Sequence, residues 1–186
     1  MRQVMKMAVA VTAASLALAA CGSSSTGTTP SAGSTGGAAS GIKVGMAYDV
    51  GGRGDQSFND AAAAGLDKAA KDLGITSKEA SATNGEAESA RTERLKQLID
   101  AGYTNIVAVG FAYAKAVGTV AKANPNVKFA IVDDASPDST GANIENITFA
   151  EHEGSFLVGA AAALKSTAKH VGFVGGVETD LIKKFQ

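Results

Sequence analysis

Short apolar runs alternate with longer amphipathic segments along residues 41–150. Runs of this kind are typical of buried parallel strands that are separated by helices. We expect strands at residues 42–47, 75–82, 104–109, 127–132 and 144–150. We expect helices at residues 60–73, 86–101 and 112–123. The order predicts an α/β fold: a doubly wound parallel sheet with helices on both faces and right-handed crossovers.

The turn at residues 48–59, between the first expected strand and helix, is rich in glycine. It ends with Phe58 and Asn59 at the helix start, and Asp55 lies just before them. In sheets of this class, ligands bind outside the carboxyl ends of the strands. An aromatic face beside an amide and a carboxylate suits a flat ring with polar edges, such as a nucleobase, or a sugar. The alternative is a plain connection whose glycines only permit the bend.

Two further expected strands end in residues that could contact a ligand at the same carboxyl edge of the sheet. Gly110 and Phe111 follow the third strand, and Asp133 follows the fourth. A carboxylate can accept hydrogen bonds from two vicinal hydroxyls. The alternatives are a core position for Phe111 under the next helix and a solvated turn at Asp133 and Asp134.

Signals for catalysis are weak. A dinucleotide fingerprint fails because Ser57 stands where its third glycine belongs, and the acidic residue, Asp72, falls inside a predicted helix. The chain has two histidines, and His152 between two glutamates has poor geometry for a metal. We find no phosphate loop of the Walker type and no nucleophile–base pair. We therefore predict a protein that is not an enzyme and uses no cofactor or metal.

The N-terminus has the pattern of a lipoprotein signal peptide. Arg2 and Lys6 precede an apolar run at residues 7–18 that is too short to span a bilayer stably. Small residues then lead directly to Cys21, the only cysteine of the chain. This ending resembles the lipobox of bacterial lipoproteins, which predicts a signal peptide at residues 1–20 and a lipid on Cys21. A signal peptide with a chance cysteine is the alternative.

Residues 21–40 form a tether between that cysteine and the folded body. The segment is almost entirely Gly, Ser, Thr and Ala, and it carries no charge. Such a coil spans roughly 25 Å on average. Removing residues 1–20 leaves 15 basic side chains against 18 acidic ones, a formal charge of −3. A mildly acidic body without a basic patch excludes nucleic acid as a partner.

After residue 150 we expect a helix at 157–164, a strand at 171–174, and a helix that opens at 179. Three segments carry a family resemblance: Gly54–Asn59, Glu153–Ala160, and Gly172–Gly176 with the following Leu181–Phe185. Together they resemble the basic membrane protein family. These proteins are lipoprotein substrate-binding components of ABC importers, and some members bind purine nucleosides. The resemblance runs from the lipobox to the last residue.

The resemblance implies a type I periplasmic-binding fold, in which two α/β lobes close on a ligand. Phe58 would stack on the base, and Asn59 would bond to its edge. The same lobe would also contribute Asp55, Gly110, Phe111 and Asp133, and the second lobe would contribute Gly175 and Gly176. Residues 41–150 would form the N-terminal lobe. Residues 151–186 would be the hinge and the incomplete start of the second lobe, so we expect the sequence to be truncated.

The function implied by the resemblance is an extracytoplasmic, lipid-anchored substrate-binding protein of an ABC importer for purine nucleosides. Its partners would be the permease and ATPase subunits, with the membrane reached through the lipid anchor. Three alternatives remain: a ligand-sensing lipoprotein without a transporter, a sugar-binding member of the same fold, and an extracytoplasmic nucleoside hydrolase.

The lipobox generates a first prediction. Cys21→Ser removes the only thiol that could carry the lipid. Stable anchoring needs more than one acyl chain, so loss of the attachment site abolishes membrane retention. We expect the variant in the soluble fraction or as an unprocessed precursor, measured by fractionation and intact mass. Normal processing with unchanged membrane retention would contradict the prediction.

Overall fold

The computed structural model describes residues 41–186. Cys21, the predicted signal peptide and the predicted tether lie outside the described residues. No helix within residues 41–186 combines the length and the apolar character that a bilayer crossing requires.

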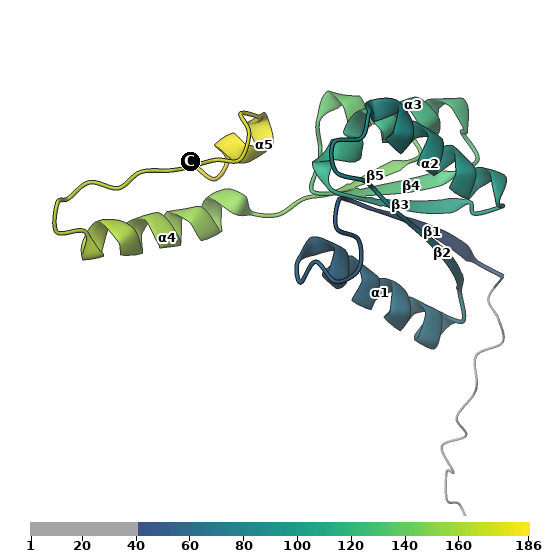
Figure 1. Cartoon of the computed structure of the whole chain (residues 1–186), viewed down its shortest axis with the longest axis horizontal. Coiled ribbons are helices and arrows are strands. Elements are labelled where there is room, and N and C mark those ends of the chain that lie inside the picture. Colours follow the sequence, from purple (N-terminus) through teal and green to yellow (C-terminus); the bar gives the residue numbers. More distant parts are fainter. Residues whose placement is uncertain (1–40) are drawn as a thin grey trace, which may run out of the picture. The chain divides into compact units, whose positions relative to one another are not determined.

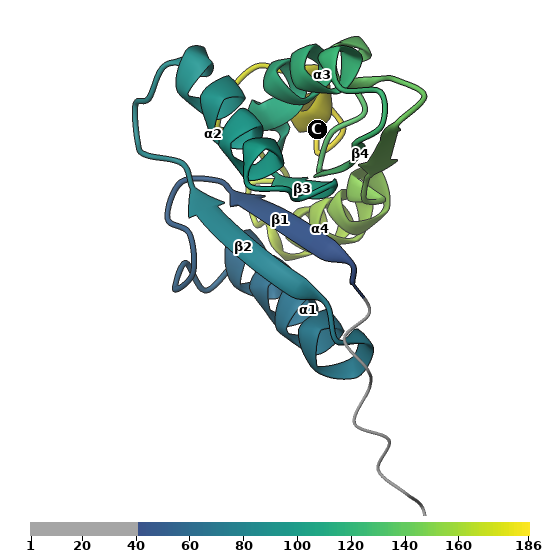
Figure 2. The ribbon, with the colours of Figure 1, turned by 90° about the vertical axis from the view of Figure 1, so that its right-hand side faces the viewer.

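Five parallel strands form one sheet in the order β2-β1-β3-β4-β5. The strands are β1 (Lys43–Tyr48), β2 (Thr76–Ser81), β3 (Asn105–Val109), β4 (Lys128–Val132) and β5 (Ile144–Ile147). Helix α1 (Phe58–Leu73) covers one face, and α2 (Glu88–Asp100) and α3 (Ala114–Ala123) cover the other (Figure 1, Figure 2). The predicted α/β class, with a parallel sheet between helices, is confirmed.

Each face of the sheet has its own apolar core. Under α1, buried side chains of β1 and β3 meet Ala63 and Leu66. The larger core lies under α2 and α3, where Leu95, Leu98 and Val117 pack on the strands. Small residues such as Ala47 and Ala108, both fully buried, let the helices approach the central strands. Burial on both faces is the reason that these strands read as continuous apolar runs.

Several element boundaries differ from the predicted ones. Helix α1 begins at Phe58, and β5 ends at Ile147. A short 3₁₀ turn, η1 (Phe111–Tyr113), precedes α3, and a second, η2 (Pro137–Ser139), follows β4. Tyr113, rather than Phe111, fills the core there, because Tyr113 is fully buried whereas Phe111 is 36% exposed.

Residues 151–186 form α4 (Glu151–Lys165), an extended segment and α5 (Asp180–Lys183). The predicted strand at 171–174 is wrong, since the described residues provide no neighbouring strand with which it could pair. Only Glu151 is buried within α4. The apolar side chains of this part of the chain are correspondingly exposed, including Phe156, Leu157, Leu164 and Val174.

Gly118 of α3 is required by close packing. A Cβ at this position would lie deep inside contact distance of the backbone carbonyl oxygen of Asp138, in η2. Because a backbone atom cannot step aside as a side chain can, the substitution forces the helix and the turn apart.

We expect Gly118→Ala to lower the free energy of unfolding by about 1–3 kcal/mol or more. The matched control is Gly65→Ala in α1, where a Cβ meets nothing within 4 Å. Gly65→Ala reduces the backbone freedom of the unfolded chain without a clash in the folded one. It should therefore raise the free energy of unfolding by roughly 0.5–1 kcal/mol. Denaturant unfolding of both variants measures the two effects, and equal values for the two would contradict the packing argument.

Candidate functional site

The turn between β1 and α1 is held by two carboxylates. Asp55 accepts hydrogen bonds from the backbone N–H groups of Ser57 (2.9 Å), Asn59 (3.0 Å) and Asp60 (3.0 Å). Asp60 in turn accepts from the backbone of Gly54 and Gln56. The side chain of Ser57, the N-cap residue, makes no cap bond, so Asp55 caps the helix. The carboxylate that we predicted to line a cleft serves here as a helix cap.

The environment of Asp55 favours its charged form. Desolvation works to raise the pKa of this carboxyl, but the backbone N–H groups of Ser57, Asn59 and Asp60 outweigh it. The net result is a pKa below the usual range for Asp. An ionised Asp55 at the open N–H groups of α1 also complements the helix dipole.

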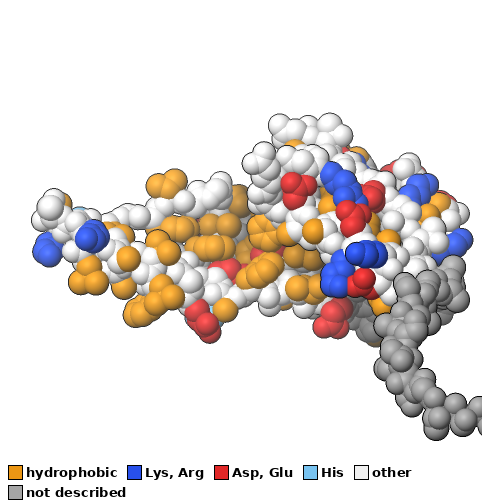
Figure 3. All heavy atoms as spheres, turned by 90° about the horizontal axis from the view of Figure 1, so that it is seen from below, with side chains coloured by type: hydrophobic (Ala, Val, Ile, Leu, Met, Phe, Trp, Pro, Cys, Tyr) orange, Lys and Arg blue, Asp and Glu red, His pale blue; other side chains and the backbone are white. Residues whose placement is uncertain are grey.

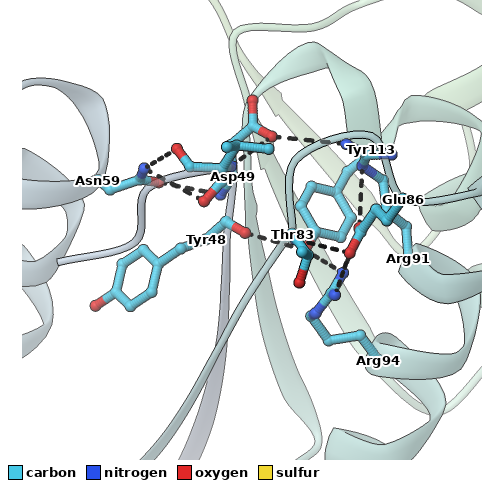
Figure 4. A network of polar contacts seen from close by, with 9 residues as sticks. Tyr48, Asp49, Asn59, Thr83, Glu86, Arg91, Arg94 and Tyr113 are labelled. Carbon is cyan, nitrogen blue, oxygen red and sulfur yellow. Dashed lines mark hydrogen bonds and ion pairs between the residues drawn. The ribbon is translucent and has the colours of Figure 1, made fainter. Parts of the chain in front are cut away.

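Asn59 is 2% exposed, and its amide is engaged on both sides. Its Oδ1 accepts from the backbone N–H of Asp49 at 3.0 Å. Its Nδ2 donates to the carbonyl oxygens of Asp49 (3.4 Å) and Val50 (3.2 Å) (Figure 4). The amide that we predicted to face a ligand therefore ties α1 to the end of β1. Its structural role is to fix the path of the turn.

Phe58, the neighbouring residue, points the other way. Its side chain is 46% exposed although it opens α1. The ring meets Phe149 edge-on, with centroids 5.7 Å apart and planes at 73°. Phe149 follows the end of β5 and is itself half exposed. Sequence reasoning missed Phe149, although its position just after a strand at the carboxyl edge was a usable signal.

The two aspartates after β4 have different tasks. Asp134 is buried and accepts from the Ser136 backbone N–H and from the hydroxyls of Ser136 and Ser139, which closes the η2 turn. Asp133 has a left-handed backbone, with φ of 68°. Its backbone N–H donates to Ile147, while its carboxylate receives none of the described hydrogen bonds. Asp134 thus holds a turn, as the alternative predicted, but it is buried rather than solvated.

Burial, rather than an ion pair, is the main influence on the pKa of Asp133. Desolvation raises the pKa of its carboxyl above the usual range, and the charges of Glu151 and Asp134 raise it further. Lys184 offsets part of this effect. Carboxyls with raised pKa values in a hollow are characteristic of binding sites.

A cavity of about 970 Å³ lies where these residues meet. Its wall includes Phe58, Asp133, Phe149 and Glu151, with side chains of α4 and of residues 171–173 opposite them. The face drawn in Figure 3 shows hydrophobic side chains gathered across this part of the molecule. An apolar hollow with a few polar groups is the usual form of a small-molecule site.

The other predicted site residues do not line this cavity: Asp55, Asn59, Gly110, Phe111, Gly175 and Gly176. Gly110 has a positive φ of 96°, and a Cβ there would lie 2.9 Å from the Asp49 carboxylate, so glycine permits their close approach. A Cβ on Gly175 would collide with Ile182. Close packing within the chain therefore explains why glycine stands at positions 110 and 175.

A second polar cluster connects the carboxyl end of β1 to α2 through hydrogen bonds. Glu86 accepts two hydrogen bonds from Arg94, at 2.6 and 2.8 Å, and one from the Thr83 backbone. Arg94 also donates to the hydroxyl of Tyr113, which donates to the Tyr48 carbonyl oxygen at 3.1 Å (Figure 4). These bonds connect α2, η1 and β1 in one network.

Arg91 completes this cluster. Its guanidinium lies 3.8 Å from the Asp49 carboxylate and 3.7 Å from that of Glu86, and 5.7 Å from the ring centre of Tyr113. The side chain is largely buried. Paired charges and a cation–π contact together make its burial tolerable. No group of three or more His, Cys, Asp or Glu side chains within residues 41–186 is arranged to hold a metal ion.

Residues 42–186 match the sequence model of the Bmp family, described as ABC transporter substrate-binding protein PnrA-like. The chain belongs to the Bmp family. The predicted family and the predicted α/β fold of periplasmic-binding type are thereby confirmed. The family description is that of a substrate-binding protein, and the prediction that this chain is not an enzyme stays a prediction.

Three relatives illustrate the match. The ABC transporter nucleoside-binding protein BmpA of Lactococcus lactis is 32% identical over 97% of this chain and 51% of its own. An uncharacterized lipoprotein of Pyrococcus furiosus is 34% identical over 77% of this chain and 36% of its own. The crystal structure of a solute-binding protein of an ABC transporter system from Aeropyrum pernix superposes with a TM-score of 0.64 at 33% identity. The match covers 77% of this chain and 40% of that protein. The chain spans about half the length, or less, of these relatives.

The Glu86–Arg94 pair of this Bmp-family protein makes its stability depend on pH. The hydrogen bonds from Arg94 outweigh desolvation and lower the pKa of Glu86 to about 2. A carboxyl whose pKa is lowered by folding contributes its full stabilisation of the fold above its unfolded-state pKa of about 4.3. This contribution is lost as the pH falls through the folded-state pKa.

We expect Glu86→Gln to lower the melting temperature at pH 7 by about 5 °C, since it weakens a charged hydrogen-bond network. The difference from wild type should shrink below about pH 4.3 and vanish near pH 2. Glu88→Gln, on the exposed first turn of α2, is the matched control and should show little difference at any pH. Melting curves from pH 2 to 7 measure both, and a Glu86→Gln difference that is constant over this range would contradict the expectation.

Proposed function

We propose that the protein is an extracytoplasmic, lipid-anchored binding protein that delivers purine nucleosides to an ABC importer. The observation that carries the proposal is the exposed ring of Phe58, held beside Asp133 on the wall of one cavity. A flat apolar face with an adjacent acceptor suits a ring whose edge carries N–H and O–H donors. The nucleoside-binding relative from Lactococcus lactis supports the same ligand class.

Phe58 supplies the stacking surface. Base–aromatic stacking on proteins is worth about 1–3 kcal/mol per base, and it tolerates different bases because each has a π-face. Phe149 meets Phe58 at 5.7 Å in an edge-type contact that restricts rotation of the ring, while Phe58 remains 46% exposed. A stacking ring with restricted rotation loses less entropy when a ligand arrives.

Asn59 and Asp55 hold the backbone around Phe58 in place without lining the cavity. Asn59 bonds to the backbone of Asp49 and Val50, and Asp55 caps the first turn of α1. We propose that these two residues position Phe58, whereas Asp133 contacts the ligand directly. Gly110 and Phe111 lie outside the cavity wall, and we assign them no contact with the ligand in this conformation.

Membrane attachment through Cys21 fits this function. A diffusing binding protein is useful to an importer only when it stays near the permease, and a lipid with a flexible tether keeps it there. The permease and ATPase subunits are the partners that the family implies. The chain spans 51% of the Lactococcus lactis relative, and nucleoside binding is tested on the full-length protein.

Phe58 variants test the proposal. We expect Phe58→Ala in the full-length protein to weaken nucleoside binding about tenfold to a hundredfold, from lost stacking and burial. Phe58→Tyr should have a small effect because the ring is kept. Phe58→Leu should fall between them, since it retains apolar area without the π-face. Titration calorimetry with adenosine, inosine, free bases and sugars measures these constants.

Three outcomes would contradict the proposal. Wild-type protein that binds sugars but no nucleoside would assign the site to the sugar-binding alternative. Turnover of a nucleoside to base and ribose would assign the protein to the hydrolase class. Equal affinity of Phe58→Ala and wild type would remove Phe58 from the site.

A further inference from the structure

The connection between β2 and α2 turns at Asn84 and Gly85, the only Asn-Gly pair in the sequence. The backbone N–H of Glu86 donates to the carbonyl oxygen of Thr83 at 3.2 Å, and Gly85 has a φ of 72°. Asn84 is not among the residues with a positive φ. These features match a type II turn, which favours glycine at its third position. Both central residues are exposed, and a Cβ on Gly85 would meet nothing within 4 Å.

Two groups that can react with each other are unbonded at the tip of this turn. Among the described residues, neither the side-chain amide of Asn84 nor the backbone N–H of Gly85 has a hydrogen-bond partner. The amide of Asn146, by contrast, donates to the carbonyl oxygen of Asp134 at 3.0 Å and to Ser139 Oγ at 2.8 Å. Because Gly85 has no side chain, nothing shields its nitrogen from the amide carbon of Asn84. The turn therefore presents a nucleophile beside its electrophile.

We propose that Asn84 is a site of spontaneous deamidation, and that this modification weakens the hydrogen-bonded network around Glu86. The inference is independent of the ligand that the protein binds. In the first step, the backbone nitrogen of Gly85 gives its proton to water and forms a bond to Cγ of Asn84. The bond from Cγ to Nδ2 then breaks. The departing nitrogen takes up a proton from water and leaves as ammonia, and a succinimide ring remains.

Water then opens the succinimide at one of its two carbonyl carbons. Attack at Cγ gives aspartate and leaves the main chain unchanged. Attack at the backbone carbonyl carbon gives isoaspartate, in which the main chain runs through Cβ and Cγ and the former backbone carbonyl becomes the carboxylate. Across both steps one water is consumed and one ammonia is released, and nothing is oxidised or reduced. Either product adds a negative charge to the turn.

The modified turn is held by the same carboxylate that bonds to α2. The backbone N–H of Thr83 donates to Glu86 Oε2 at 2.8 Å, and Arg94 donates to both oxygens of Glu86 (Figure 4). Isoaspartate adds a main-chain carbon between Thr83 and Glu86, which moves these residues out of their bonding positions. A new carboxylate two residues from Glu86 also repels it. Deamidation therefore lowers the stability that this network provides.

Peptide mapping by mass spectrometry tests the modification on the full-length protein, incubated at neutral and at mildly alkaline pH. We expect conversion of Asn84 to isoaspartate and aspartate, faster at the higher pH because the deprotonated backbone amide is the nucleophile. Asn126 is the matched internal control. It is also exposed and its amide makes none of the described hydrogen bonds, but the N–H of the following Val127 donates to Asn124 at 3.0 Å. Asn126 should remain unmodified over the same period.

A synthetic peptide of residues 80–90 gives the rate of the same reaction without the fold. Since few hydrogen bonds hold the turn, the protein should react no more than about tenfold more slowly than the peptide. Asn84→Gln should remain unmodified, because its longer side chain closes a ring less readily. A reaction in the protein that is slower than the peptide by more than about tenfold would overturn the inference. Modification of Asn126 as fast as that of Asn84 would overturn it as well.

Thermal unfolding of the separated forms tests the structural consequence. The isoaspartate form should melt about 2–4 °C below the unmodified protein. Asn84→Asp reproduces the aspartate product with an unchanged main chain, so its decrease should be smaller. In a Glu86→Gln background the isoaspartate effect should shrink, because both changes act on one network. Equal melting temperatures of the isoaspartate and unmodified forms, or an equal loss with and without Glu86→Gln, would overturn the link to this network.

Discussion

The buried amide of Asn59 is the interaction on which the site depends. It accepts from the Asp49 backbone and donates to the carbonyl oxygens of Asp49 and Val50, and it thereby joins the start of α1 to the end of β1. A buried polar group that loses its hydrogen-bond partners costs about 1–3 kcal/mol, so conformations of the turn that leave this amide unpaired are disfavoured. Since Asn59 points inward at the first turn of α1, the preceding Phe58 is directed outward, toward the cavity.

Around this point the carboxyl edge of the sheet is divided into two regions. On the α2 side, Glu86, Arg94 and Tyr113 form a hydrogen-bonded network, although Nε of the neighbouring Arg91 has no hydrogen-bond partner among the described residues. On the other side, Asp133 and Glu151 carry carboxylates without hydrogen bonds and lie beside exposed aromatic rings. We place the proposed ligand in the second region because aromatic rings and Asp133 line one cavity there.

Membership of the Bmp family rests on the match over residues 42–186, and the fold agrees with it. The substrate-binding role, the nucleoside ligand and the lipid anchor are proposals. Stacking distinguishes poorly between ligands that share a base, so other contacts must supply that selectivity.

The sequence by itself determined the parallel α/β sheet, because strands buried on both faces must be continuous apolar runs and the helices between them must be amphipathic. It also placed Phe58 and Asp133 at one edge, since parallel strands end together. Tertiary structure alone decided that Asn59 and Asp55 face the backbone, that Asp134 closes a turn while Asp133 does not, and that Phe149 and Glu151 join the cavity wall. The reason is that spacing along the chain sets the edge at which a side chain lies, whereas its partner depends on which hydrogen-bonding groups the packed chain brings within about 3 Å.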